Sequence, residues 1–182
     1  MEIINTPIKD LVVIKPKVFA DARGFFFETY NEERYREAGI TQKFVQDNMS
    51  KSSYGVVRGL HFQKPPYSQA KLVQVIEGAV LDVAVDLRSD SETYGQWYAV
   101  ELTAENHLQF LIPRGFAHGF AVLSETAIFS YKCDNFYHPE ADGGVIYNDP
   151  TLNIDWGIPA DKIVLSEKDT KHPLLKDLGT IF

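Results

Sequence analysis

The chain has 182 residues, a length that suits a single domain over residues 1–182 with a complete hydrophobic core. Its formal net charge is −7 and no block of five like charges occurs, which argues against a broad nucleic-acid-binding surface. The N-terminus lacks a signal-peptide pattern, and no apolar run approaches the roughly 18 residues that span a bilayer. Cys133 is the single cysteine and cannot form an intramolecular disulfide, so the sequence predicts a cytoplasmic protein without a membrane partner.

Strands are expected early in the chain, over residues 8–14 and 25–29. Between 23 and 28 the sequence Arg-Gly-Phe-Phe-Phe-Glu places a cation, an aromatic run and a carboxylate close together. This segment has two interpretations. It is either the core of a strand with charged ends, or a nucleotide contact in which Arg23 binds a phosphate and an aromatic ring stacks on a base. A helix is expected over residues 31–38, because Asn31 can cap its start and Gly39 follows its end.

From residue 56 onward short strands dominate, separated by turn signals at 77–78, 94–95, 143–144 and 148–150. This spacing is typical of a sandwich or a barrel. The first of these strands carries Arg-Gly-Leu-His-Phe-Gln at 58–63. His61 is either a hydrogen-bonded core histidine or a general base oriented by a carboxylate. Arg58 and His61 would face opposite sides of a regular strand, so a shared site requires a bulge near Gly59.

Lys71 begins a strand expected over residues 72–76. It is either a solvated lysine or a cation that stabilises a developing enolate oxygen inside the barrel. In the next strand, residues 79–88, Leu81 and Val83 lie on an apolar face, whereas Asp82 and Asp86 lie on the other. This alternation is typical of a β-strand.

The segment Pro-Arg-Gly-Phe-Ala-His-Gly-Phe at 113–120 fits Pro-x-Gly-x-x-His, the second half of the cupin signature. The first half normally contains His-x-His, but here Gln63 stands where the second histidine is expected. His118 is a candidate metal ligand, but zinc and iron sites normally need three protein ligands and the usual partners are absent. The substitution therefore points to a cupin barrel that works without a metal.

In the strand over 127–134, Tyr131 shares an apolar face with Ala127 and Phe129. It is either a core tyrosine with a satisfied hydroxyl or a general acid that faces a cavity. Near the C-terminus, Ser166 and Asp169 have the spacing of a capping box at a short helix. The remaining histidines lie in expected loops and show no functional pattern: His107, His138 and His172.

Six short motifs occur in order along the chain: Arg-Gly-x-Phe-x-Glu at 23–28, Phe-Val-Gln-Asp-Asn at 44–48, the histidine segments at 58–63 and 112–120, Tyr-Lys at 131–132 and Leu-Ser-Glu-Lys-Asp at 165–169. With these motifs the whole chain closely resembles the dTDP-4-dehydrorhamnose 3,5-epimerases. The resemblance implies a mainly β, cupin-type jelly-roll barrel with a few short helices. It also implies a dTDP-sugar substrate, no cofactor, no metal, and a homodimer with shared N-terminal strands.

The same resemblance implies specific catalytic roles. His61 would be the base, oriented by Asp169, and Tyr131 would be the acid on the opposite face of the sugar. Lys71 would stabilise the enolate. A ketone makes neighbouring C–H groups weakly acidic, and inversion needs a base, a cation and an opposed acid, so these residue types suit the chemistry.

Further residues would bind the nucleotide sugar: Arg23, Glu28, Gln46, Asp47, Asn48, Arg58, His118 and Lys168. Phe26 and Tyr137 are implied stacking partners for thymine. Asp142 stands where many family members carry a glutamate, and its shorter side chain alters that binding contact. The implied reaction is epimerisation at carbons 3 and 5 of dTDP-4-dehydro-6-deoxy-D-glucose.

Three alternatives remain at this point. A single-site epimerase on a related dTDP-4-keto deoxysugar would share the fold and the base. A non-catalytic nucleotide-sugar-binding cupin would be expected to lose His61, Lys71 or Tyr131, and all three are present. A metal-dependent cupin oxygenase would need the second histidine that Gln63 replaces.

Overall fold

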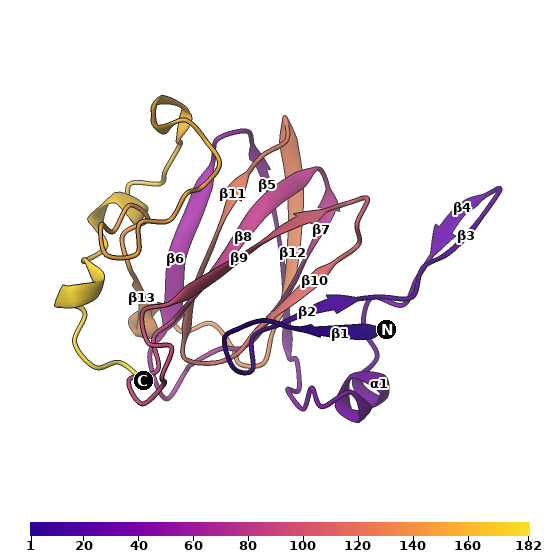
Figure 1. Ribbon diagram of the computed structural model, residues 1–182, viewed down its shortest axis with the longest axis horizontal. Coiled ribbons are helices and arrows are strands. Elements are labelled where there is room, and N and C mark those ends of the chain that lie inside the picture. The colour runs from indigo at the N-terminus through magenta and orange to yellow at the C-terminus, as the bar shows by residue number, and fades with distance from the viewer.

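The computed structural model describes residues 1–182, and antiparallel strands dominate it (Figure 1). A six-stranded sheet has the order β1-β2-β10-β7-β12-β5, and a five-stranded sheet has the order β13-β6-β11-β8-β9. The strand bounds are β1 Glu2–Asn5, β2 Val12–Lys15, β3 Phe19–Asp21, β4 Gly24–Phe26, β5 Gln46–Ser53, β6 Val57–Gln63, β7 Lys71–Glu77, β8 Ala79–Asp86, β9 Trp97–Thr103, β10 Gln109–Ile112, β11 Phe116–Val122, β12 Thr126–Cys133 and β13 Asp142–Gly144.

The inner core joins the two sheets. Val73 and Phe129 from the six-stranded sheet pack in one cluster with Val80, Ala84 and Phe120 from the five-stranded sheet. Two antiparallel sheets that enclose a shared core form the jelly-roll barrel expected from the sequence, and that expectation is confirmed.

The expected helix near residue 31 is confirmed as α1, Glu32–Glu37. The side chain of Asn31 accepts a hydrogen bond from the backbone N–H of Arg34, and Gly39 follows with a φ of 89°. The other helical segments are single 3₁₀ turns at Pro139–Ala141, Ala160–Lys162, Asp169–Lys171 and Leu175–Asp177. None of these helices could span a bilayer.

The N-terminal strands differ from expectation. The strand expected over 8–14 begins only at Val12, and the strand expected over 25–29 is reduced to β4, which pairs with β3 alone. This β3–β4 hairpin projects away from the barrel (Figure 1), and its Phe25 and Phe26 are 61% and 71% exposed. No other strand of the chain pairs with the hairpin; in its own chain, Phe25 and the adjoining Phe27 pack on the ring of His107, at centroid distances of 4.6 and 4.9 Å.

The strand expected from the alternation over residues 79–88 is confirmed as β8, but both of its faces are covered. Val80 and Ala84 face the inner core, whereas Val83 and Val85 pack in an outer cluster with Trp156. The C-terminal segment supplies that outer layer and covers the five-stranded sheet on the left of Figure 1. Both faces of β8 are therefore buried, and its carboxylates need polar partners inside the protein.

Of the expected turns, the one at 143–144 is also wrong. Gly143 and Gly144 belong to β13, which pairs with β6 so that Gly144 lies opposite His61. A side chain at 143 would collide with the ring of Phe62, and one at 144 with the ring of His172. These glycines are therefore needed for close packing against β6 and the C-terminal segment.

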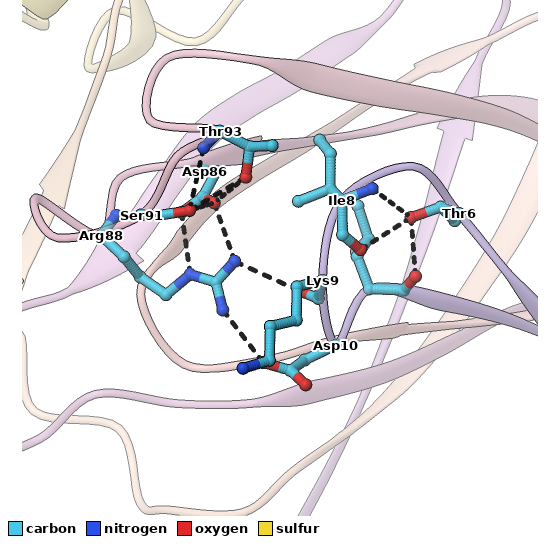
Figure 2. A network of polar contacts seen from close by, with 9 residues as sticks. Thr6, Ile8, Lys9, Asp10, Asp86, Arg88, Ser91 and Thr93 are labelled. Carbon is cyan, nitrogen blue, oxygen red and sulfur yellow. Dashed lines mark hydrogen bonds and ion pairs between the residues drawn. The ribbon is translucent and has the colours of Figure 1, made fainter.

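Arg88 ties the N-terminal segment to the end of β8 (Figure 2). Its guanidinium donates to the Asp86 carboxylate at 2.8 and 2.9 Å and to Asp10 at 3.1 Å. The hydroxyls of Ser91 and Thr93 each donate to Asp86 at 2.7 Å. Burial by itself would raise the pKa of Asp86, but these hydrogen bonds outweigh it and lower the pKa to about 2.

Candidate active site

A cavity of about 380 Å³ is lined by side chains from both sheets and by residues 164–169 of the C-terminal segment. It brings together seven residues that the sequence analysis singled out: Arg58, His61, Lys71, His118, Tyr131, Lys168 and Asp169. They come from β6, β7, β11, β12 and the start of the 3₁₀ helix Asp169–Lys171, with Lys168 just before it. A pocket of this size with convergent polar groups is typical of a small-molecule site.

His61 and Asp169 form a close pair in this cavity. The Nε2 atom of His61 lies 2.5 Å from Oδ1 of Asp169, whose side chain is only 3% exposed. The backbone N–H of Asp169 donates to Oγ of Ser166 at 3.2 Å in the preceding turn, but the 3₁₀ helix begins at Asp169 with Lys168 at its N-cap, so the expected capping box at Ser166 is wrong. Burial acts to raise the pKa of Asp169, but the hydrogen bond with His61 contributes in the other direction and the net pKa is lowered. The carboxylate is therefore ionised at neutral pH.

An ionised Asp169 determines which nitrogen of His61 carries the proton. A carboxylate only accepts hydrogen bonds, so Nε2 of the neutral ring must be the donor. Nδ1 then has a free lone pair and can accept a proton. The His61 side chain is 30% exposed, so the ring is reachable from the cavity.

A bulge in β6 lets Arg58 and His61 serve the same cavity. The pairing of β6 with β11 shifts register between residues 118 and 120, and Gly59 has a φ of 139°. A Cβ atom at Gly59 would lie 2.5 Å from Cα of Gly119, so only glycine fits this close approach. The bulge predicted near Gly59 is thus confirmed.

His118 lies opposite His61 across the β6–β11 pairing and is buried. Its Nε2 lies 3.0 Å from both carboxylate oxygens of Asp82, which lies on the face of β8 opposite the apolar residues Leu81 and Val83. Burial lowers the pKa of His118 and raises that of Asp82. Asp82 therefore fixes the His118 ring, and the sequence pattern gave no sign of this partner.

The cupin metal set does not fit these residues. Gln63 occupies the position of the missing histidine, and its amide N–H groups donate to the backbone carbonyls of Tyr67 and Phe136 at 2.8 and 3.0 Å. Its amide oxygen accepts from the backbone N–H of His138 at 2.6 Å. The Gln63 amide is thus fully engaged by backbone groups and is not free to ligate an ion beside His61.

Tyr131 and Lys71 face the cavity from the opposite sheet, on the neighbouring strands β12 and β7. The Nζ atom of Lys71 lies 5.8 Å from the centroid of the Tyr131 ring. Tyr131 packs against the inner core with Phe129, as the alternation predicted. Burial raises the pKa of Tyr131, which keeps its hydroxyl protonated, and burial lowers the pKa of Lys71.

Four further predicted residues, Gln46, Asn48, Tyr137 and Asp142, form one polar network with Lys168 beside the cavity. The amide of Gln46 donates to Asn48 at 3.2 Å and accepts from the backbone N–H of Tyr137 at 3.0 Å. Asp142 forms an ion pair with Lys168 and accepts from the Tyr137 hydroxyl at 3.5 Å. Asn48 lies directly opposite Tyr131 in the β5–β12 pairing, which joins this network to the cavity.

Four predicted residues do not reach the cavity of their own chain. Arg23 and Phe26 belong to the projecting hairpin, and the Arg23 side chain is 89% exposed. Glu28 pairs instead with Arg34 at 2.9 Å. Asp47 pairs with Lys132 at 2.9 Å, because strand alternation turns it away from the face of its neighbours in β5.

His172 is a residue of this site that the sequence analysis missed. Its Nε2 lies 3.6 Å from Oδ1 of Asp169, and its ring centroid lies 5.4 Å from that of His61. Burial lowers the pKa of His172. The spacing Asp-x-x-His offered a signal, since side chains three apart eclipse one another in a 3₁₀ turn.

Comparisons with known proteins agree with this geometry. A family model described as dTDP-4-dehydrorhamnose 3,5-epimerase matches residues 5–177. The crystal structure of dTDP-4-dehydrorhamnose 3,5-epimerase from Elizabethkingia anophelis is 60% identical, with a TM-score of 0.94 and 98% of each chain covered. An Escherichia coli protein of the same name is 48% identical over 98% of this chain and 96% of its own length.

A third relative was solved with a ligand. It is dTDP-6-deoxy-D-glucose-3,5-epimerase from Legionella pneumophila in complex with dTDP-4-keto-L-rhamnose, 52% identical with a TM-score of 0.93, covering 97% of this chain and 94% of that one. The barrel and the order of its motifs thus have full-length counterparts in solved structures. By sequence and by fold, this chain belongs to the dTDP-4-dehydrorhamnose 3,5-epimerase family.

Proposed function

We propose that this chain epimerises dTDP-4-dehydro-6-deoxy-D-glucose at carbons 3 and 5, giving dTDP-4-dehydro-L-rhamnose. One observation carries the proposal. The His61–Asp169 pair faces the cavity from the five-stranded sheet and the adjoining C-terminal segment, whereas Tyr131 and Lys71 face it from the six-stranded sheet. A base and an acid on opposing walls are what inversion of a carbon centre requires. The full-length relatives named above bear the name of this activity.

The proposed chemistry uses only side chains of the cavity. Nδ1 of His61 removes the proton beside the C4 ketone, and the electron pair of that C–H bond moves onto the ketone oxygen as an enolate. The Lys71 ammonium stabilises this oxygen. The Tyr131 hydroxyl then donates a proton to the other face of the carbon as the ketone re-forms. His61 leaves protonated and Tyr131 leaves as phenolate, and both exchange protons with solvent before the second inversion.

The proposed binding mode assigns the nucleotide to the rim. Arg58 and Lys168 supply cations for the diphosphate, and Tyr137 supplies a ring for the base. Gln46 and Asn48 offer amide groups beside them, and their mutual hydrogen bond and the contact with the Tyr137 backbone support this arrangement. His118, fixed by Asp82, contacts the sugar within the cavity, and Asp142 orients Lys168 through its ion pair.

We also propose a homodimer in which the β3–β4 hairpin reaches the partner's cavity. Its exposed aromatic side chains support this: Phe19 is 54% exposed, Phe25 61% and Phe26 71%. Exposed aromatic clusters of this kind are typical of interfaces. Arg23, Phe26 and Glu28 would then complete the binding site of the other subunit. Sedimentation is expected to give twice the chain mass. A cytoplasmic location also remains a prediction, based on the single free cysteine, Cys133.

The test follows proton exchange with the substrate in heavy water. The unmodified enzyme is expected to introduce deuterium at both carbon 3 and carbon 5. His61→Ala should reduce exchange at both carbons by at least about 10²-fold, the usual contribution of a positioned general base. Calorimetric binding of dTDP to the variant checks that its site is still folded.

The alternatives predict different patterns. Deuterium at carbon 3 alone would identify a single-site epimerase. A complete lack of exchange in unmodified protein that still binds dTDP would indicate a non-catalytic binding protein. Near-normal exchange in His61→Ala would show that another group removes the protons.

A further inference from the structure

We propose that His61, Asp169 and His172 together form a binding site for one divalent transition-metal ion such as Zn²⁺, and that the bound ion inhibits the enzyme. The binding part of this inference stands on the geometry alone. The inhibition part rests on the proposed function, because it requires His61 to be the base.

The three ligand atoms are already close to metal-binding distances. Nε2 of His61, a carboxylate oxygen of Asp169 and a ring nitrogen of His172 all lie within 4.8 Å of one another. Tetrahedral zinc with bonds of about 2.0–2.2 Å separates its ligand atoms by about 3.3 Å. The observed separations of 2.5 Å, between His61 and Asp169, and 3.6 Å, between His172 and Asp169, lie on either side of that value. Small side-chain movements would therefore complete the site.

A second observation points to a ligand. The His172 side chain is only 10% exposed, and its Nε2 atom is buried without a hydrogen-bond partner. Buried polar atoms in native proteins normally have a partner, so this nitrogen calls for an explanation. The ring packs directly over Gly144, because a Cβ there would lie 2.6 Å from two ring atoms of His172. The nitrogen is thus held beside Asp169 by packing rather than by a hydrogen bond.

The donor set and the local charge suit a transition metal. Two imidazole nitrogens and one carboxylate oxygen are typical zinc ligands, and they leave a fourth position for water. The carboxylate of Asp169 supplies the negative charge. Lys168 in the same segment would repel a bound metal ion, but its ion pair with Asp142 offsets that repulsion. His61 and Asp169 line the cavity, so an ion can enter from that side.

The ion would inhibit by changing the tautomer of His61. The proposed base requires a proton on Nε2, donated to Asp169, and a free lone pair on Nδ1. A metal ion on Nε2 takes the lone pair of that atom, so the ring proton must move to Nδ1 by exchange with solvent. A protonated Nδ1 cannot accept a proton from the sugar. The ion also occupies the Asp169 oxygen that orients the ring.

The experiment titrates EDTA-treated, full-length protein with Zn²⁺, and in parallel with Co²⁺ to follow its visible absorption. One ion per chain is expected to bind, and Zn²⁺ should suppress deuterium exchange in step with occupancy. EDTA should restore the exchange, and EDTA alone should leave the enzyme active. His172→Gln should weaken binding at least about tenfold, the loss that even outer-shell partners of a ligand typically cause.

Two further variants serve as controls for this titration. His172→Phe fills about the same space without a ligand nitrogen, so it is also expected to lose the ion. Agreement between the two His172 variants shows that the loss does not come from a folding defect in one of them. His138→Gln is the matched control, because His138 pairs with Glu140 at 3.0 Å but lacks a second imidazole nearby. Its affinity for Zn²⁺ should equal that of the unmodified protein. Inhibition is measured in each variant relative to its own activity in EDTA.

The outcomes separate the two parts of the inference. Equal Zn²⁺ affinity in unmodified protein and both His172 variants, or no binding of one equivalent, overturns the metal site. Binding that depends on His172 but leaves exchange unchanged keeps the metal site and overturns inhibition through the tautomer of His61. Loss of exchange in His61→Ala, measured without metal, tests the proposed function separately.

Discussion

His61 and Tyr131 differ in how the fold controls their protons. The proton of His61 is directed to Nε2 by an ionised carboxylate, Asp169, at 2.5 Å. The proton of Tyr131 is retained because burial raises the pKa of its hydroxyl. In the proposed reaction, His61 accepts a proton and Tyr131 donates one.

Tyr131→Phe tests that division of roles. The change removes one hydroxyl and keeps the ring packed against Phe129, so the fold should be unaffected. Proton removal by His61 should continue, but inversion should fall by about 10²–10⁴-fold, because His61 returns deuterium only to the face from which the proton came. Stereochemical analysis of the labelled sugar by NMR measures this. Unimpaired double inversion in the variant would assign the acid to another group or to water.

Two local features of the strands, regular alternation and a register shift, orient these side chains toward the cavity. Regular alternation in β12 directs Tyr131 inward with Phe129. In β6 the register shift beside Gly59 turns Arg58 toward the cavity that His61 also lines. A regular strand could not have presented both, since residues three apart lie on opposite faces.

The end of β8 carries a prediction about acid stability. The pKa of Asp86 is about 2 in the folded protein, below the ordinary 3.8. A lowered pKa contributes stability above the ordinary value, and this contribution is lost as the pH falls from about 4 to about 2. We expect it to amount to about 2 kcal/mol of the unfolding free energy at neutral pH. Asp86→Asn should therefore lower stability at pH 7 and flatten the decline below pH 4.

Urea unfolding between pH 2.5 and pH 7, at one fixed chain concentration, measures this effect. Asp161→Asn is the control, because Asp161 is largely exposed and its nearest cation lies 3.8 Å away. That variant should unfold as the unmodified protein does. If Asp86→Asn unfolds with the same pH dependence as the control, the network around Arg88 does not stabilise the fold through this carboxylate.

At the scale of the whole molecule, two segments lie outside the two sheets of the barrel. The C-terminal segment covers the five-stranded sheet and delivers Asp169 and His172 to β6. Asp149 anchors this segment, because its buried carboxylate accepts from the backbone N–H groups of Leu152 and Leu175 at 3.0 and 2.7 Å. The hairpin at the other end leaves its own barrel and is proposed to serve a second subunit.

Mixing two inactive variants tests the shared site. Arg23→Ala removes the proposed contact with the partner's cavity, and His61→Ala removes the base. A mixed dimer contains one complete site, formed by the intact His61 of one chain and the intact Arg23 of the other. Random mixing makes half of the dimers mixed, so about a quarter of the native activity should return.

Activity is measured after unfolding and refolding the two variants together, with each variant refolded alone as the control. Recovery no greater than the sum of the two separate activities would place Arg23 outside the partner's site. Sedimentation of the mixture confirms that dimers formed.

The sequence by itself determined the short-range features of this protein. The cap at Asn31, the inward face of Tyr131 and the need for a bulge at Gly59 follow from alternation, capping and glycine chemistry within a few residues. The order of the motifs gave the family and, through it, the set of residues that meet in the cavity. The pairing of His61 with Asp169 was implied by that resemblance and not by any pattern between them, since they are 108 positions apart.

Only the tertiary structure decided the partners of buried polar groups. Alternation in β8 could not reveal that the C-terminal segment covers its outer face, or that Asp82 lies inside the barrel against His118. Nor could any local pattern show that His172 packs against the ring of His61, or that the hairpin of Arg23 lies outside its own barrel. A local pattern records which side of a strand a residue takes, but what lies on that side depends on segments distant in the chain and on how the sheets pack.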